Sequence, residues 1–249
     1  MTRCVCLALL VCAGCQGSFG RVPPRPPALT VAEPQRSGAG TDPTEELLNR
    51  AVALLEKGLD AEALPHLERY VHERPEQLLA RANLGELLFR QQKLPESRLQ
   101  FELFIGMAQE QGDPAFRYLI HAHSRLVEIS EALENVYDEH LNRGIGLYLL
   151  AQKRATEPDP NGDYSTDSLL MKAAGELRDA RAEQPDESRP SYYLYQIWTR
   201  LGQHSAAQRA LAAAEGHALL SRLTPLERRQ LQIAALRRAG QEAISLNRR

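Results

Sequence analysis

The 249-residue sequence predicts an all-α fold, an α-solenoid of stacked antiparallel helical hairpins. Helix start signals recur along the chain, and side chains repeat with a period of 34 residues. No stretch of alternating valine, isoleucine and threonine is long enough for a sheet. Apolar residues make up 43% of the chain and charged residues 25%, which is sufficient for a packed core.

Helix start signals lie at three places. In each, a capping side chain precedes proline, which suits the first helical turn. In the first and last, acids also stand near the positive end of the helix dipole. The three signals are Thr41 or Asp42 before Pro43 with Glu45 and Glu46, then Asp113-Pro114, then Thr224-Pro225-Leu226-Glu227.

The 34-residue period is clearest in the unit that starts at residue 44. Its positions 4, 8, 11, 15, 20, 24, 27 and 32 are Leu47, Ala51, Leu54, Gly58, Ala63, Leu67, Tyr70 and Pro75. Later units hold matching residues at Leu84, Gly85, Leu88, Ser97, Phe101 and Phe104, at Ala173, Leu177, Ala180 and Pro185, and at Trp198, Gly202, Ala207, Leu211 and Ala214. This pattern resembles the tetratricopeptide repeat, a helix–turn–helix module. The resemblance implies that small residues at positions 8 and 20 let paired helices approach, and that proline at 32 ends the second helix.

The expected repeat domain spans residues 44–215, with about five to six units. The resemblance is good over 44–111 and 167–215, whereas 114–130 and 131–155 are expected to be helices without clean repeat register. Residues 156–166 are expected to be a loop inserted between the two helices of one hairpin. Two amphipathic helices in 216–249 would cap the stack, because a terminal repeat must present a polar outer face. A non-repetitive helical bundle is the alternative.

All four cysteines lie in the first fifteen residues, which begin with a short positive segment and an apolar run too short to span a membrane. The segment Cys12-Ala13-Gly14-Cys15 resembles the lipobox of bacterial lipoproteins, although that pattern prefers leucine where Cys12 stands. The resemblance implies that residues 1–14 are a signal peptide and that Cys15 is acylated. The alternative is a plain secretory signal cleaved near Gly14.

Residues 15–43 are expected to form a disordered tether behind the lipid. Six prolines and four glycines, with almost no apolar periodicity, leave too little apolar surface for folding. Gln16 stands where the inner-membrane retention rule of some Gram-negative bacteria requires aspartate. We therefore expect a cell-envelope location on the periplasmic side, in the outer membrane rather than the inner.

Candidate catalytic chemistry is limited. His121 and His123 would suit a metal pair, but residues two apart on a helix point to different faces, so we expect two ordinary helical histidines. No nucleophile elbow, phosphate-binding glycine loop or zinc-protease motif occurs. The sequence therefore predicts no enzyme activity, cofactor or metal.

Residues 159–167 place side-chain oxygens at every second position, as a calcium-binding loop does. However, Tyr164 and Leu170 stand where such a loop needs glycine and a bidentate glutamate. A polar surface loop, with Ser165 or Asp167 capping the next helix, is the expected structure.

Charge is unevenly distributed along the chain. The net charge of −2 argues against a nucleic-acid binder. Residues 44–215 hold 19 basic and 28 acidic side chains, whereas 216–249 hold seven arginines and two glutamates. We expect the basic segment to be a solvated cap packed on the last repeat; the alternative is contact with anionic lipid or an acidic partner.

The repeat resemblance also implies a concave groove lined by positions 2, 5, 9, 12 and 13 of each unit. These positions are Glu45, Leu48, Val52, Leu55 and Glu56, then Leu79, Ala82, Glu86, Phe89 and Arg90, then Arg189, Tyr192, Gln196, Thr199 and Arg200. Its apolar members could hold a partner helix or an extended peptide. The family's clamp for a terminal carboxylate requires lysine and asparagine at positions 5 and 9, which are Leu48 and Val52 here, so that activity is not expected.

These observations together predict a membrane-anchored, non-enzymatic scaffold that binds another envelope protein or peptide in the groove. The alternative is a module that binds a lipid or small solute in a closed pocket. A deep pocket with convergent polar groups would favour that alternative.

Overall fold

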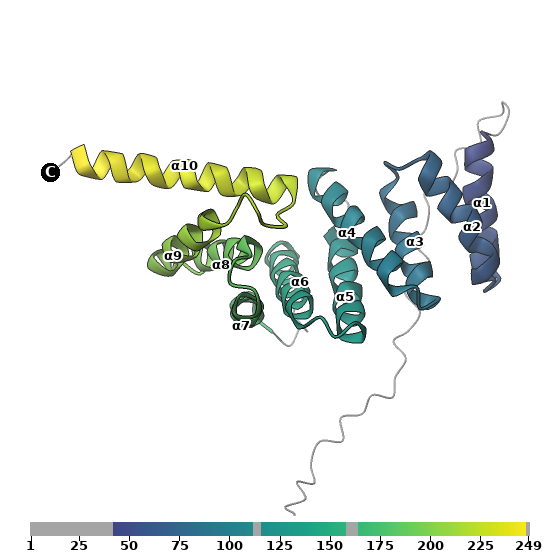
Figure 1. The fold of residues 1–249 in the computed structure, drawn as a ribbon, viewed down its shortest axis with the longest axis horizontal. Helices are drawn as coiled ribbons and strands as arrows, with labels where there is room; N and C mark the ends of the chain where they lie inside the picture. The colour runs from purple at the N-terminus through teal and green to yellow at the C-terminus, as the bar shows by residue number, and fades with distance from the viewer. Residues whose placement is uncertain (1–41, 112–115, 158–163, 248–249) are drawn as a thin grey trace, which may run out of the picture. The chain divides into compact units, whose positions relative to one another are not determined.

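The computed structural model describes residues 42–111, 116–157 and 164–247, and every regular element in these ranges is an α-helix (Figure 1). The helices are α1 (Pro43–Glu56), α2 (Asp60–Glu73), α3 (Leu78–Arg90), α4 (Leu94–Gln111), α5 (Phe116–Ala132), α6 (Val136–Thr156), α7 (Thr166–Glu183), α8 (Ser188–Arg200), α9 (His204–Gly216) and α10 (Pro225–Asn247). The all-α prediction is confirmed. No helix in the described ranges has the length and apolar character needed to cross a bilayer.

Four pairs of helices form hairpins, and the turn between the two helices is of the same type in each. The pairs are α1/α2, α3/α4, α5/α6 and α8/α9. Each turn has one residue with positive φ, and the amide of the next residue donates to the carbonyl five positions earlier, as from Leu59 to Leu54 at 2.9 Å. The positive-φ residues are Gly58, Gln92, Glu134 and Gly202. The α5/α6 pair therefore has the turn of a repeat unit, although its sequence lacks clean register.

A second type of connection follows α2 and α7. Each helix ends just before a proline, Pro75 or Pro185, and a short turn leads into the next helix. The helix α7 packs on α6 and begins at Thr166, the last residue of the region 156–166 that was expected to be a loop. Ser165 caps α7, because its hydroxyl accepts a hydrogen bond from the Ser168 amide at 3.2 Å.

Three predicted features lie outside the described residues. They are residues 158–163 of the calcium-like segment, the Asp113-Pro114 start signal, and the region up to Thr41, which includes Cys15.

The core follows the repeat positions. Position 24 is filled by large side chains that are almost wholly buried: Leu67, Phe101, Leu177 and Leu211. The small residues at positions 8 and 20 are also buried, including Ala51, Ala63, Ala173 and Ala207. Small residues let the paired helices approach, and the large ones fill the gap between hairpins. The predicted stack of antiparallel hairpins is therefore confirmed.

The carboxy-terminal region differs from expectation. Residues 217–220 form turns and 221–224 are irregular, and a single 23-residue helix, α10, follows where two capping helices were expected. A capping box starts this helix: Thr224 Oγ1 accepts from the Glu227 amide at 3.2 Å, and Glu227 Oε2 accepts from the Thr224 amide at 2.9 Å. No proline follows Pro225, and Gly240 lies within the helix without ending it, so nothing divides the segment.

Candidate functional site

The predicted groove residues lie on α1, α3 and α8, the first helices of three hairpins. Their burial differs. Three are buried, Leu48, Ala82 and Tyr192; the half-buried members are Val52, Leu55, Leu79, Glu86, Phe89, Arg189 and Gln196; the exposed ones are Glu45, Glu56, Arg90, Thr199 and Arg200. Leu48 shares the inner face of α1 with Ala51, where it packs inside the structure and is not open to a partner.

The helices α3 and α5 meet at Glu86. Arg125 binds its carboxylate through two nitrogens, from Nε to Oε2 at 2.9 Å and from Nη2 to Oε1 at 3.0 Å. His121 Nε2 lies 3.2 Å from the same Oε2. Burial alone would raise the pKa of Glu86, but the hydrogen bonds from His121 and Arg125 outweigh it and hold that pKa at about 2. Glu86 is therefore ionised and fixed in one orientation.

The same arginine covers an aromatic ring. The Arg125 guanidinium lies 4.7 Å from the centre of the Phe89 ring, and its Nη1 also donates to both oxygens of Glu128 at 2.9 Å. All three guanidinium nitrogens of Arg125 thus have carboxylate partners. The contacts among Glu86, Phe89, His121 and Arg125 therefore join α3 to α5, the first helices of two hairpins.

The two histidines of α5 point to different partners. His121 faces Glu86, whereas His123 is buried and its Nδ1 lies 2.9 Å from Asn142 Oδ1 on α6. Burial lowers the pKa of His123 to about 4, so its ring is neutral at neutral pH. The prediction that the two rings lie on different faces is confirmed. In the described residues, no group of three or more potential metal ligands comes together.

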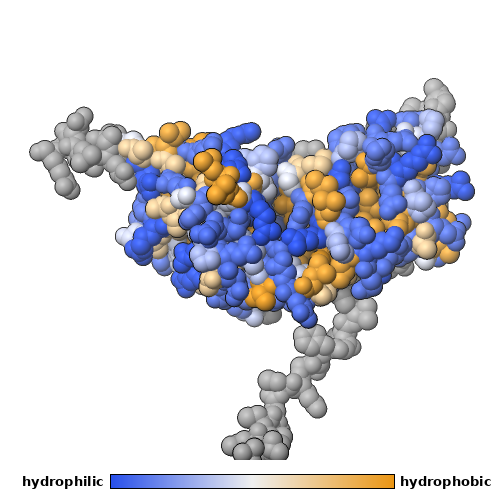
Figure 2. Space-filling model, viewed as in Figure 1, coloured by the Kyte–Doolittle hydropathy of each residue, from blue (hydrophilic) through white to orange (hydrophobic). Residues whose placement is uncertain are grey.

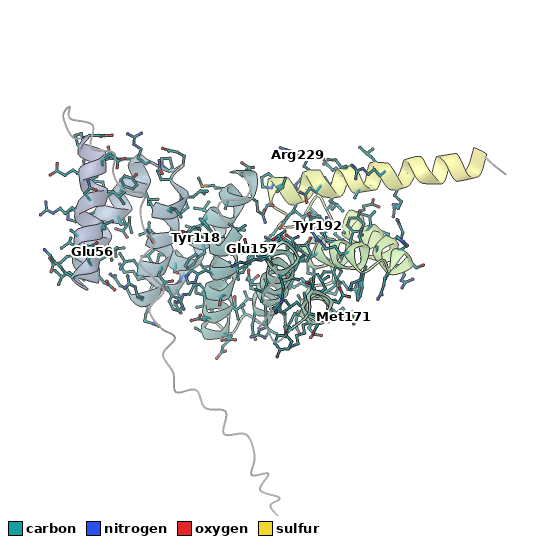
Figure 3. The ribbon with its side chains drawn as sticks, turned by 180° about the vertical axis from the view of Figure 1, so that it is seen from behind. Glu56, Tyr118, Glu157, Met171, Tyr192 and Arg229 are labelled. Carbon is teal, nitrogen blue, oxygen red and sulfur yellow. The ribbon has the colours of Figure 1, made fainter. Side chains whose placement is uncertain are left out.

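The chain itself covers the α8 part of the predicted groove. Glu227 of α10 accepts from Arg189 Nη2 at 3.0 Å and from the Tyr193 hydroxyl at 2.6 Å, and Gln230 accepts from the Tyr192 hydroxyl. Figure 3 labels Tyr192 beneath α10. Tyr192 is therefore an internal contact and not an open groove residue. The sequence indicated a cap, but not that the cap would lie on these positions.

Other predicted groove residues are held within the chain. Arg90 forms an ion pair with Asp60 of α2 at 3.0 Å. Arg200 lies over the Tyr148 ring of α6 at 5.5 Å. These contacts tie neighbouring hairpins together. The open apolar part of the groove consequently lies on α1 and α3.

Arg125 and His121 were not among the predicted groove residues, although both contact Glu86, which was. The signal that could have indicated them is Glu86 itself, because a half-buried carboxylate requires a cation or hydrogen-bond donors nearby. The register of α5 could not be read from its repeat positions, so no residue of that helix was assigned to the groove.

A small hollow lies between α4 and α10. It has a volume of about 220 Å³ and is lined by Glu110, Leu226 and Arg229. Ligand pockets for drug-sized molecules usually measure about 300–1,000 Å³ and are mostly apolar. This hollow is smaller and carries two charged side chains, so it does not favour a solute-binding site.

Comparisons with known proteins found similar solved structures at low identity. No family model and no curated protein matches the sequence. Among solved structures, a MamA RS-1 ArsTM double mutant is similar at 14% identity, with a TM-score of 0.36, over 72% of this chain and 97% of that chain. MamA 41-end from Desulfovibrio magneticus RS-1 has 16% identity and a TM-score of 0.34, over 74% and 100%. YrrB, a TPR protein with an unusual peptide-binding site, has 12% identity and a TM-score of 0.33, over 75% and 90%.

Proposed function

We propose that this chain is a membrane-anchored, non-enzymatic scaffold of the bacterial cell envelope that binds a segment of another envelope protein along α1, α3 and α5. One observation carries the proposal. Val52, Leu55, Leu79 and Phe89 leave apolar side chains only half-buried on the first helices of two successive hairpins. A helix or extended peptide that offers apolar side chains at regular spacing can cover such a row.

The charges beside this row suit a partner segment that also carries basic residues. Glu45 and Glu56 of α1 are exposed, and Glu128 of α5 is largely exposed. The positive charge of Arg125 is already balanced by two carboxylates. Residues 44–215 hold more acids than bases. Complementary charge guides association and orientation more than it adds affinity.

A rigid surface favours such binding. The Glu86–Arg125 pair fixes α3 against α5, so the row is formed before the partner arrives and little ordering is needed on binding. Since α10 already covers Arg189 and Tyr192, the partner segment would lie on the amino-terminal hairpins.

The membrane anchor in this proposal is a lipid on Cys15. One acyl chain binds a membrane only marginally, and two or more anchor it stably. The test is Cys15→Ser, which should release the protein from the membrane fraction; the control Cys6→Ser, within the apolar run, should remain there. Continued retention of Cys15→Ser in the membrane fraction would refute the lipid anchor.

The partner is tested by chemical crosslinking in the native envelope, followed by mass spectrometry of the captured species. The proposal expects one or a few envelope proteins, captured from the wild type and lost when Val52 and Leu55 are both changed to Asp. If only lipid or a small solute co-purifies, the scaffold proposal fails.

A further inference from the structure

The helix α10 has two different faces. Its inner face is buried on the rest of the structure through Glu227, Leu231 and Ala234. A second face carries Leu226, Arg229, Ile233, Leu236 and Arg237, which the helical spacing gathers on one side of the helix, with Leu226 and Arg229 beside Glu110 of α4. We call these five residues the outer stripe. Ile233 is 43% exposed and Leu236 is 73% exposed, which is unusual for large apolar side chains on an otherwise packed helix.

A pair of exposed leucines lies beside α10, in the segment that Arg228 binds. Leu219 and Leu220, in the turns just before α10, are 90% and 92% exposed. They are held in place from both sides, because Arg228 of α10 donates to the carbonyls of Ala218 at 2.5 Å and of Ser221 at 3.2 Å. The pair therefore protrudes from a fixed backbone. Figure 2 shows hydrophobic residues on the surface formed by α10 and beside it.

Both charged residues of the outer stripe are arginines, and Glu110 of α4 lies beside one of them, Arg229. Glu227 is buried and paired with Arg189, so it does not balance the outer arginines. Arg229 and Arg237 are exposed, and no ion pair among the described residues involves either one. Figure 3 labels Arg229 on the side of α10 that faces away from Tyr192. The outer stripe thus combines the exposed apolar side chains of Ile233 and Leu236 with two exposed arginines.

We infer that the outer stripe and the Leu219–Leu220 pair dock on an anionic lipid surface. An amphipathic helix with arginines and large apolar residues on its open face lies in the membrane interface, with its apolar side chains among the acyl chains. Each arginine near an anionic surface strengthens binding about fivefold. A protein partner would need a groove shaped to a helix face and a protruding leucine pair, whereas a lipid surface adapts to both.

This docking is independent of the groove partner and of the lipid on Cys15. It would fix the orientation of the hairpins at the membrane, so that α10 faces the lipid. The main competing occupant is a second copy of the chain, whose residues 44–215 are acidic. The experiment below separates the two.

The experiment measures flotation of the full chain carrying Cys15→Ser with lipid vesicles. Phosphatidylcholine vesicles are compared with vesicles of phosphatidylcholine and phosphatidylglycerol in equal parts. We expect binding to the mixed vesicles only. In this background, Leu219→Ser with Leu220→Ser should weaken binding about tenfold or more, since each leucine loses its apolar burial. Changing Arg229 and Arg237 to Gln should weaken it about fivefold for each charge.

The matched control is Leu99→Ser with Leu103→Ser, which removes two exposed leucines from α4 and should leave vesicle binding unchanged. Circular dichroism should show equal helix content in all variants. The inference is overturned if the protein ignores anionic vesicles, or if the α4 control weakens binding as much as the α10 variants. It is also overturned if the leucine changes abolish self-association in sedimentation without changing vesicle binding, because the occupant would then be a second copy.

Discussion

Arg189 of α8 and Glu227 of α10 form a buried ion pair, with Arg189 Nε 3.0 Å from Glu227 Oε2. Their side chains are only 14% and 3% exposed. Burial alone would raise the pKa of Glu227, but the charge of Arg189 and the Tyr193 hydroxyl outweigh it and lower that pKa. The pair joins the last helix to α8 and closes that part of the groove.

Breaking this pair from one side should destabilise the fold strongly. Glu227→Gln leaves Arg189 buried and unpaired, which we expect to lower the free energy of unfolding by about 3–5 kcal/mol. Urea denaturation followed by circular dichroism measures this change. The control is Glu157→Gln, which removes an exposed pair with Lys153 at 4.0 Å and should cost under about 1 kcal/mol. Equal losses in both variants would contradict the structural role of the buried pair.

The close contact between α6 and α7 makes a second prediction. A Cβ at Gly144 would lie 2.7 Å from Leu177 Cγ and 3.3 Å from the Ala173 carbonyl oxygen. Gly144→Ala should therefore destabilise the fold by about 1–3 kcal/mol, despite the better helix propensity of alanine. In the same helix, a Cβ at Gly146 meets only His123 Cβ, at 3.6 Å. Gly146→Ala should be neutral or stabilise by up to about 1 kcal/mol. Similar melting temperatures for the two variants would rule out this packing.

The buried His123 predicts a pH dependence of stability. Its folded pKa is about 4, below the ordinary value of 6.5. Between these values the unfolded chain binds a proton that the folded chain does not, so stability should fall as pH falls from 6.5 to 4. His123→Gln should reduce this slope in urea titrations, whereas His204→Gln, at an exposed position, should keep the wild-type slope. An unchanged slope in His123→Gln would contradict the buried neutral ring.

The Glu86–Arg125 pair should show energetic coupling. The folded pKa of Glu86 is about 2, below its ordinary value of 4.5, so its stabilising contribution is present above pH 4.5 and is lost as pH falls toward 2. At pH 7, Glu86→Gln and Arg125→Gln should each destabilise by about 1–3 kcal/mol. The double variant should cost less than the sum, by about 1–2 kcal/mol. At pH 2 this difference should shrink; simple additivity at pH 7 would show that the pair is not coupled.

Much of the fold could be predicted because one period controls both local structure and packing. Position 24 is a large buried side chain in each well-matched unit, from Leu67 to Leu211, and the proline at position 32 follows the end of the second helix. The α5/α6 hairpin was harder to assign. Its turn uses Glu134 in the left-handed region, where glycine would have been the usual signal.

The site was less predictable because its contacts are long-range. Glu86 and Arg125 are brought together by the packing of α3 on α5, and no local pattern fixes the register of α5. The burial of Tyr192 depends on where α10 lies, which its own amphipathic pattern does not specify. By contrast, the capping box at Thr224 and the cap at Ser165 are local interactions, and both were predicted correctly.

Binding of an envelope protein along α1 and α3 is tested most directly by site-specific photo-crosslinking in living cells. A photoreactive residue is placed at Leu55 of α1 or Leu79 of α3, in the open apolar row. Leu103 of α4 and Met171 of α7 serve as exposed control positions outside the row. We expect the two row positions to capture the same envelope protein and the two control positions to capture none of it. Capture from Leu103 and Met171 at the same level, or no protein captured from either row position, would contradict this expectation.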